Sequence, residues 1–259
     1  MIWLFLLPFL LSSCKADDRE MLTKAEPIVR KSNNKEYLLK EPVIRPSPNY
    51  PWTKKGPSKY TKITKEHFRC KGSFTNPVRT VVQKSGSLER YFDCGGMDRH
   101  SLYLKEGQEF IYPVLINLLN YVQEVSEHKV IVTSGYRCPD HSIYVEPSNR
   151  SSKHMVGAAV TFYVQDYEIQ KVVNLIQKYY VQDKKLCHFE RYTKEDTDCS
   201  IQPWMNKEIY FKVYKENEGR NCDNSHPFSY ISLQVRHDMS CDKKVVYSWE
   251  EAFRSYLRK

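Results

Sequence analysis

The chain has 259 residues, of which 41% are hydrophobic, enough for one packed domain with extensions. Its formal net charge of +9 indicates affinity for polyanions. The basic residues are spread along the chain and accompany no nucleic-acid-binding motif, so we expect no nucleic-acid partner.

The N-terminal segment has the features of an export signal. Residues 2–11 form an apolar stretch that is too short to cross a membrane as a permanent helix. This stretch runs into Leu-Ser-Ser-Cys at 11–14, which resembles the lipobox of bacterial lipoproteins. We therefore expect a signal peptide over residues 1–13 and a lipid on Cys14, with an ordinary secretory signal as the alternative. Such a lipid would tether the protein to a membrane of the bacterial cell envelope, facing the periplasm or the exterior.

Residues 14–67 are polar and interrupted by prolines, which predicts an extended tether ahead of a folded domain over residues 68–259. Export favours disulfides among the cysteines, although seven remain after Cys14 and their connectivity cannot be deduced. Cys187 with Cys199 and Cys222 with Cys241 are plausible local pairs. Cys138 is the candidate for a free thiol or a ligand, with a disulfide as the favoured state.

Hydrophobic periodicity predicts a mixture of helices and strands in the domain. An apolar stripe indicates a helix at 107–125, and a strand follows at 129–133. A polar loop is expected at 138–152, then a strand at 156–164 and a helix at 166–180 that starts from Asp166 as its N-cap. Residues 187–204 look irregular. Strands are expected at 208–214 and 228–236, and a final helix at 249–257 begins from a capping box at Ser248.

Two motifs follow the first strand and lead into the second. They are Ser-Gly-Tyr-Arg at 134–137 and Ser-Lys-His-Met-Val-Gly-Ala-Ala-Val-Thr at 152–161. In this order and separation they resemble the zinc D-Ala-D-Ala carboxypeptidases of bacterial cell walls, whose pattern is S-G-Y-R, S-x-H-x-x-G-x-A-x-D and a late H-x-D-x-R. The resemblance implies an α+β fold, with a small antiparallel sheet flanked by helices. The signalling domain of hedgehog proteins is similar in fold.

The resemblance also implies a zinc site in which His154 is one ligand. Zinc hydrolases use three protein ligands and an open position, where the metal activates a water molecule. This sequence departs from the pattern, because Thr161 replaces the aspartate, Ser232 the late histidine and Gln234 the late aspartate. A single imidazole cannot hold catalytic zinc, so we expect no metal cofactor and no peptidase activity.

Four residues of the family pattern remain as candidates for ligand binding: Ser134, Arg137, Ser152 and Arg236. The planar guanidinium of arginine can hold a carboxylate without a metal. For Arg137 and His154, purely structural roles are the alternative.

The sequence thus favours a non-catalytic envelope lipoprotein that binds peptidoglycan stem peptides or an envelope protein. One alternative is an active zinc peptidase with relocated ligands, such as His141, His188 or His237. The other is a disulfide-stapled structural envelope protein that has no small ligand.

Overall fold

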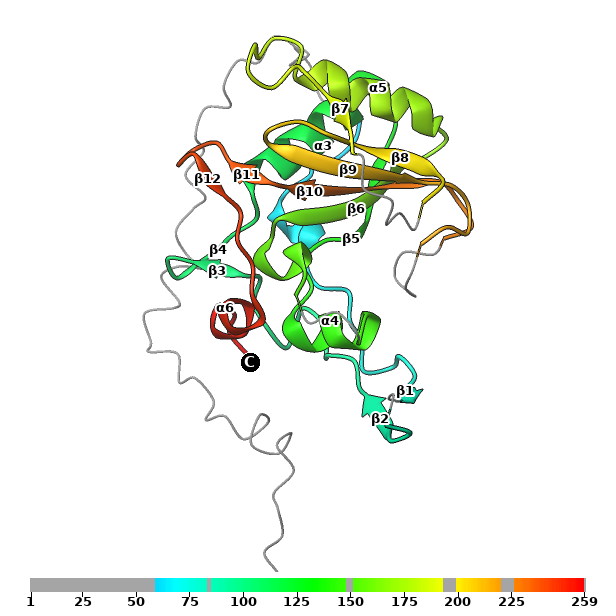
Figure 1. Cartoon of the computed structure of the whole chain (residues 1–259), viewed down its shortest axis with the longest axis vertical. Coiled ribbons are helices and arrows are strands. Elements are labelled where there is room, and N and C mark those ends of the chain that lie inside the picture. The colour runs from blue at the N-terminus through cyan, green and yellow to red at the C-terminus, as the bar shows by residue number, and fades with distance from the viewer. Residues whose placement is uncertain (1–58, 83–84, 148–150, 193–198, 220–225, 259) are drawn as a thin grey trace, which may run out of the picture. The chain divides into compact units, whose positions relative to one another are not determined.

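The structure is a computed structural model that describes residues 59–82, 85–147, 151–192, 199–219 and 226–258. The predicted signal peptide, Cys14, most of the predicted tether and Cys222 lie outside these residues. The described part combines helices with antiparallel sheets (Figure 1), which confirms the predicted α+β class. Within the described ranges, no helix is both long enough and apolar enough to cross a membrane.

A six-stranded sheet forms the centre of the domain, with neighbouring strands antiparallel in the order β5-β6-β10-β9-β8-β7. Strands β9 (Ile209–Tyr214) and β10 (Tyr230–Val235) lie where the sequence predicts them. The same holds for β5 (Val130–Ser134) and β6 (Ala159–Val164). Strands β7 (Glu190–Arg191) and β8 (Ile201–Met205) lie in the region expected to be irregular.

Two helices, α3 (Pro113–Ser126) and α5 (Ile169–Tyr179), pack together over one face of the sheet (Figure 1). Their buried leucines and valines join those of β5, β6 and β10 in one core. Both helices begin later than predicted. Residues before α3 instead form the hairpin of β3 (Leu104–Lys105) and β4 (Gln108–Glu109), which turns at Gly107 with φ +76°. Asp166 has φ +53° and does not cap α5, whose N-cap residue is Glu168.

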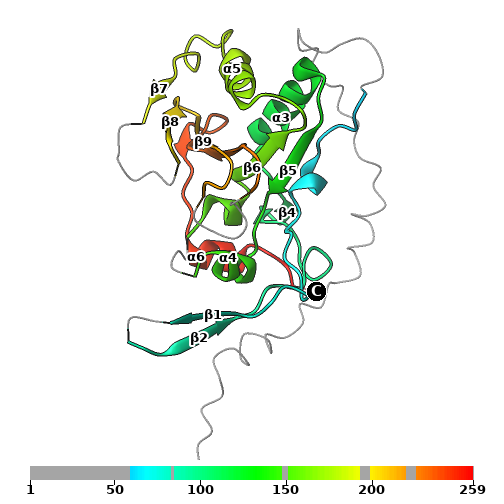
Figure 2. The same cartoon turned by 90° about the vertical axis from the view of Figure 1, so that its right-hand side faces the viewer.

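A second group of elements lies beyond the edge of the sheet. Part of the segment predicted to be a polar loop forms helix α4 (Pro139–Val145). The helix starts there because the Cys138 side chain caps it and Pro139 suits its first turn. Figure 2 shows α4 beside α6 (Trp249–Arg254), which Ser248 caps as predicted by accepting the Glu251 N–H at 3.1 Å. The remaining elements are η1 (Lys65–Phe68), the projecting hairpin of β1 (Arg79–Val82) and β2 (Leu88–Tyr91), and the hairpin of β11 (His237–Asp238) and β12 (Lys243–Lys244).

Candidate functional site

Three hydroxyl side chains form a row across the strands that carry the family motifs. Thr161 on β6 pairs with Ser232 on β10 and, on its other side, with Ser134 on β5. Directly paired residues place their side chains on the same face of a sheet. A register shift between Val132 and Ser134 brings Ser134 opposite Thr161. All three hydroxyl residues are buried, and Thr161 Oγ1 has no hydrogen-bond partner among the described residues.

His154 lies in η2 (Lys153–Val156), a short helix that leads into β6. Ser152 caps this helix, because its Oγ accepts the N–H of His154 at 3.3 Å. Gly157 ends it with φ +67°, and a Cβ there would lie 2.7 Å from the carbonyl oxygen of Phe110. Glycine is therefore needed at this position for both its conformation and its size. The ring of His154 is buried, and its Nδ1 lies 2.5 Å from the carbonyl oxygen of Gly135.

The two motif arginines lie in different surroundings. Arg137 is only 3% exposed, its Nε donates to Ser134 Oγ at 2.9 Å, and its backbone N–H donates to the carbonyl of His154. Arg236 is half-buried, and its Nη1 donates to the carbonyl of Asn206 at 2.6 Å. Gln234 is also half-buried and pairs across the strands with Ala159 and Tyr210.

Arg236 belongs to a group of cations that the sequence analysis missed. Lys153, the residue before His154, donates its Nζ to the carbonyl of Val235 at 2.5 Å. Burial, followed by the charges of Arg236 and Lys244, lowers the pKa of Lys153 to about 8. Lys153, Arg236 and Lys244 are named the basic cluster below. Because these like charges repel one another, the cluster favours a bound anion.

The residues at the motif positions do not fit a zinc ion. Thr161 and Ser232 are neutral hydroxyl residues, which are poor zinc ligands. The described residues hold no group of three potential metal ligands that includes His154. The predicted substitutes do not gather there either. His141 pairs with Asp93, His237 pairs with Asp242, and His188 is exposed.

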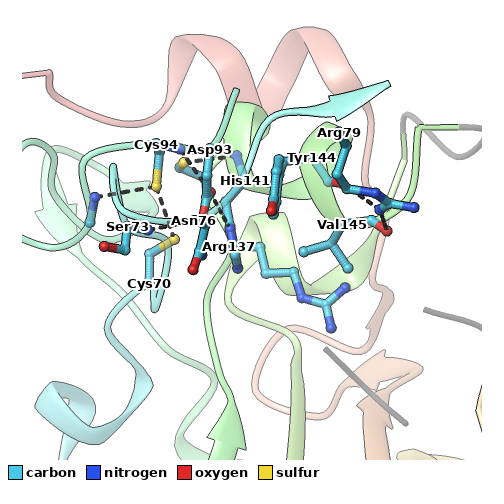
Figure 3. Close-up of polar contacts among 12 residues, drawn as sticks. Cys70, Ser73, Asn76, Arg79, Asp93, Cys94, Arg137, His141, Tyr144 and Val145 are labelled. Atoms are coloured by element: carbon cyan, nitrogen blue, oxygen red, sulfur yellow. Dashed lines mark hydrogen bonds and ion pairs between the residues drawn. The ribbon is translucent and has the colours of Figure 1, made fainter. Parts of the chain in front are cut away.

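A second buried polar region adjoins the first motif, around Asp93 and His141 (Figure 3). His141 Nδ1 lies 2.6 Å from Asp93 Oδ1, which also accepts the N–H of Cys94. The other carboxylate oxygen accepts the N–H of Ser73 and the side-chain amide of Asn76. Burial opposes the charge of Asp93, but His141 and these donors lower the pKa of its carboxyl below the usual value. Figure 3 shows the guanidinium of Arg137 directed away from this region.

The cysteines differ from the sequence prediction. Among the described residues six are free thiols, so the predicted Cys187–Cys199 disulfide is not formed. Cys138, the candidate singled out in the sequence, is buried close to Cys70, Cys94 and His100. Burial disfavours a thiolate at Cys70, but Cys138, Cys94 and His100 around it lower its pKa well below the usual value. No Cys-x-x-Cys spacing marks this group, because its members come from four separate segments.

The comparison with protein families gives one match. The family described as Peptidase M15 matches residues 90–196, a range that contains both motifs and ends before β10. This match confirms the resemblance to the zinc D-Ala-D-Ala carboxypeptidase type of peptidase over that segment. No curated protein and no solved structure matches the chain significantly.

Proposed function

We propose that the domain is a non-catalytic relative of the zinc D,D-carboxypeptidases, with the sheet and helix arrangement that they share with hedgehog signalling domains. It binds the carboxylate end of a peptidoglycan stem peptide. The observation that carries the proposal is the replacement of two ligand positions by the buried hydroxyl residues Thr161 and Ser232, directly paired on β6 and β10. A neutral hydroxyl does not hold catalytic zinc, so the hydrolytic step has no metal to activate its water.

The basic cluster supports binding of an anion beside the former catalytic position. Lys153 directly precedes His154, and Arg236 is the retained arginine of the late family motif. The peptide's terminal carboxylate would offset the repulsion by Arg236 and Lys244, which adds to burial in lowering the pKa of Lys153. A charge-assisted pair with a half-buried lysine and arginine is stronger than a fully exposed one. The family's substrates end in D-alanine, which supplies such a carboxylate.

The lipobox-like sequence at 11–14 extends the proposal to the cell envelope. A lipid on Cys14 would hold the domain at a membrane facing the periplasm or the exterior, close to the cell wall. An envelope protein with an acidic C-terminus is the other partner that this chemistry would accept.

The test measures binding and cleavage together. The full chain, purified in mild detergent, is titrated with N-acetyl-Lys-D-Ala-D-Ala in a calorimeter, with and without added zinc. We expect binding without release of D-alanine, and about tenfold weaker binding for Lys153→Met, the effect of losing about 1.4 kcal/mol. Lys178→Met removes an exposed lysine of α5 and is the matched control. Zinc-dependent release of D-alanine, or equal binding of the C-terminal amide, contradicts the proposal.

A further inference from the structure

Four buried side chains that can bind a metal meet at one point, although they come from four separate segments of the chain. Cys70 follows η1, Cys94 follows β2, His100 pairs with Arg258 in an isolated bridge, and Cys138 is the N-cap of α4. Their ligand atoms all lie within 4.8 Å of one another. Each of the four residues is at most 7% exposed. Three sulfurs and one imidazole nitrogen are a common ligand set of structural zinc sites.

The spacing of the sulfurs matches coordination better than a covalent bond. The Sγ atoms of Cys70 and Cys94 are 3.7 Å apart (Figure 3). Two sulfurs each about 2.3 Å from a tetrahedral zinc ion would be separated by about 3.8 Å. A disulfide requires about 2.0 Å. The sulfurs of Cys70 and Cys94 are therefore separated as two corners of a zinc tetrahedron would be.

The orientation of His100 supplies the fourth ligand. Its Nδ1 lies 2.9 Å from the carbonyl oxygen of Ser101, which can only accept, so Nδ1 carries the proton. The lone pair of the neutral ring is then on Nε2. This atom is buried and has no hydrogen-bond partner in the part of the chain that the structure describes. A metal-bound histidine shows the same pattern, because a carbonyl fixes one nitrogen while the other binds the ion.

Backbone N–H groups are directed at two of the sulfurs. The N–H of Gly96 donates to Cys94 Sγ, and the N–H of His141 donates to Cys138 Sγ, each at 3.4 Å. Gly72 packs against the same place, since a Cβ there would lie 2.3 Å from Cys94 Sγ. The backbone thus encloses the sulfurs on more than one side.

We propose that Cys70, Cys94, His100 and Cys138 bind one zinc ion in a closed structural site. Four protein ligands leave no open position, so this ion holds chain segments together and activates no water. It would fix the start of α4, directly after Arg137, to the segments around Cys70, Cys94 and His100. The neighbouring group of Asp93, Cys94 and His141 is the weaker candidate, because both oxygens of Asp93 already accept hydrogen bonds. This inference does not depend on peptide binding.

The test is the zinc content of the full chain, purified without chelators or reductants after growth with added zinc. We expect about one zinc per chain, with Cys70, Cys94 and Cys138 unavailable to a thiol reagent until the metal is removed. Cys138→Ser keeps a side chain that caps α4 well but removes one thiolate, so its zinc content should fall at least tenfold. Cys187→Ser removes an exposed thiol elsewhere and should keep the zinc.

A second measurement removes the ambiguity of a variant that fails to fold. Cobalt added to the metal-free wild-type chain should give the absorption of a tetrahedral ion with thiolate-to-cobalt charge transfer, and zinc should displace it. Absence of zinc together with no such spectrum overturns the proposal. A disulfide between any two of Cys70, Cys94 and Cys138 in non-reduced peptide maps also overturns it, as does a folded Cys138→Ser variant that keeps its zinc.

Discussion

Replacing Lys153 by methionine should change how the stability of the domain depends on pH. Lys153 is held beside Arg236 and Lys244, and its pKa is lowered from 10.5 to about 8 by burial and by these charges. Between these two values the unfolded chain binds more protons than the folded one, so wild-type stability rises with pH. The gain in wild-type stability is complete above pH 10.5 and is lost as the pH falls through about 8. The Lys153→Met variant has no titrating group at this position, so its stability should lack this rise with pH.

The size of the effect follows from the shift. A difference of 2.5 between 10.5 and about 8, at 1.36 kcal/mol for each unit, gives about 3.4 kcal/mol as an upper limit. Because the residue is only partly buried and solvent screens its charge, we expect about 1–2 kcal/mol. The loss of the hydrogen bond to Val235 also affects stability, but it shifts the whole curve and leaves its slope unchanged to a first approximation.

Urea unfolding at several pH values from 7.5 to 10.5 measures the difference in unfolding free energy between wild type and Lys153→Met. This difference should grow in favour of the wild type by about 1–2 kcal/mol as the pH rises. The Lys178→Met control should run parallel to the wild type. A difference that stays constant with pH, or that grows in the opposite direction, would refute the argument that burial and the neighbouring charges lower the pKa of Lys153.

Three further predictions concern the buried polar groups. Asp93→Asn should lower the unfolding free energy by about 3 kcal/mol, because it breaks the buried pair with His141. A loss below about 0.5 kcal/mol in urea unfolding would contradict this prediction. The double variant Thr161→Asp with Ser232→His should bind a second zinc and be more stable when zinc is present. The two substitutions restore the aspartate and the late histidine of the family's ligand set beside His154. Elemental analysis and melts with and without zinc check this, and unchanged zinc content would count against it. Removing the proposed zinc with a chelator should lower the Tm by about 5–11 °C. This range follows because an ion present at a hundredfold excess over its Kd stabilises the folded state by about 2.7 kcal/mol. An unchanged Tm would show that no stabilising ion was bound.

Much of the sheet could be predicted from the sequence, because its strands are short apolar runs that end at clear turn signals. β9, β10 and the cap of α6 lie where local patterns place them. The predicted start of α3 was wrong because the apolar stripe begins before the helix. Ile111 is buried in the core and Phe110 packs against it partly buried, but both precede Pro113, where α3 starts. Helix α4 was missed because a polar segment with a cysteine cap does not show the usual pattern.

For the candidate site, too, the sequence predicts one part and not another. The meeting of Thr161 and Ser232 could be anticipated, because the family motifs place both at ligand positions. Ser134 lies opposite Thr161 through a register shift that the sequence does not show. The basic cluster and the four-ligand group could not, because each joins residues far apart in the chain without a fixed spacing. Cys70, Cys94 and Cys138 looked like candidates for disulfides in an exported protein. Only their arrangement around His100 indicates a metal.

We propose that the metal of this domain has a different position from that of the peptidase family. A crystal of the full chain or its folded part, grown without chelators, would allow an anomalous difference map at the zinc absorption edge. We expect one peak about 2.3 Å from the sulfurs of Cys70, Cys94 and Cys138, in contact with Nε2 of His100, and none beside His154. A peak at His154 near Thr161 and Ser232, with none among the cysteines, would contradict both the loss of the peptidase site and the proposed zinc site.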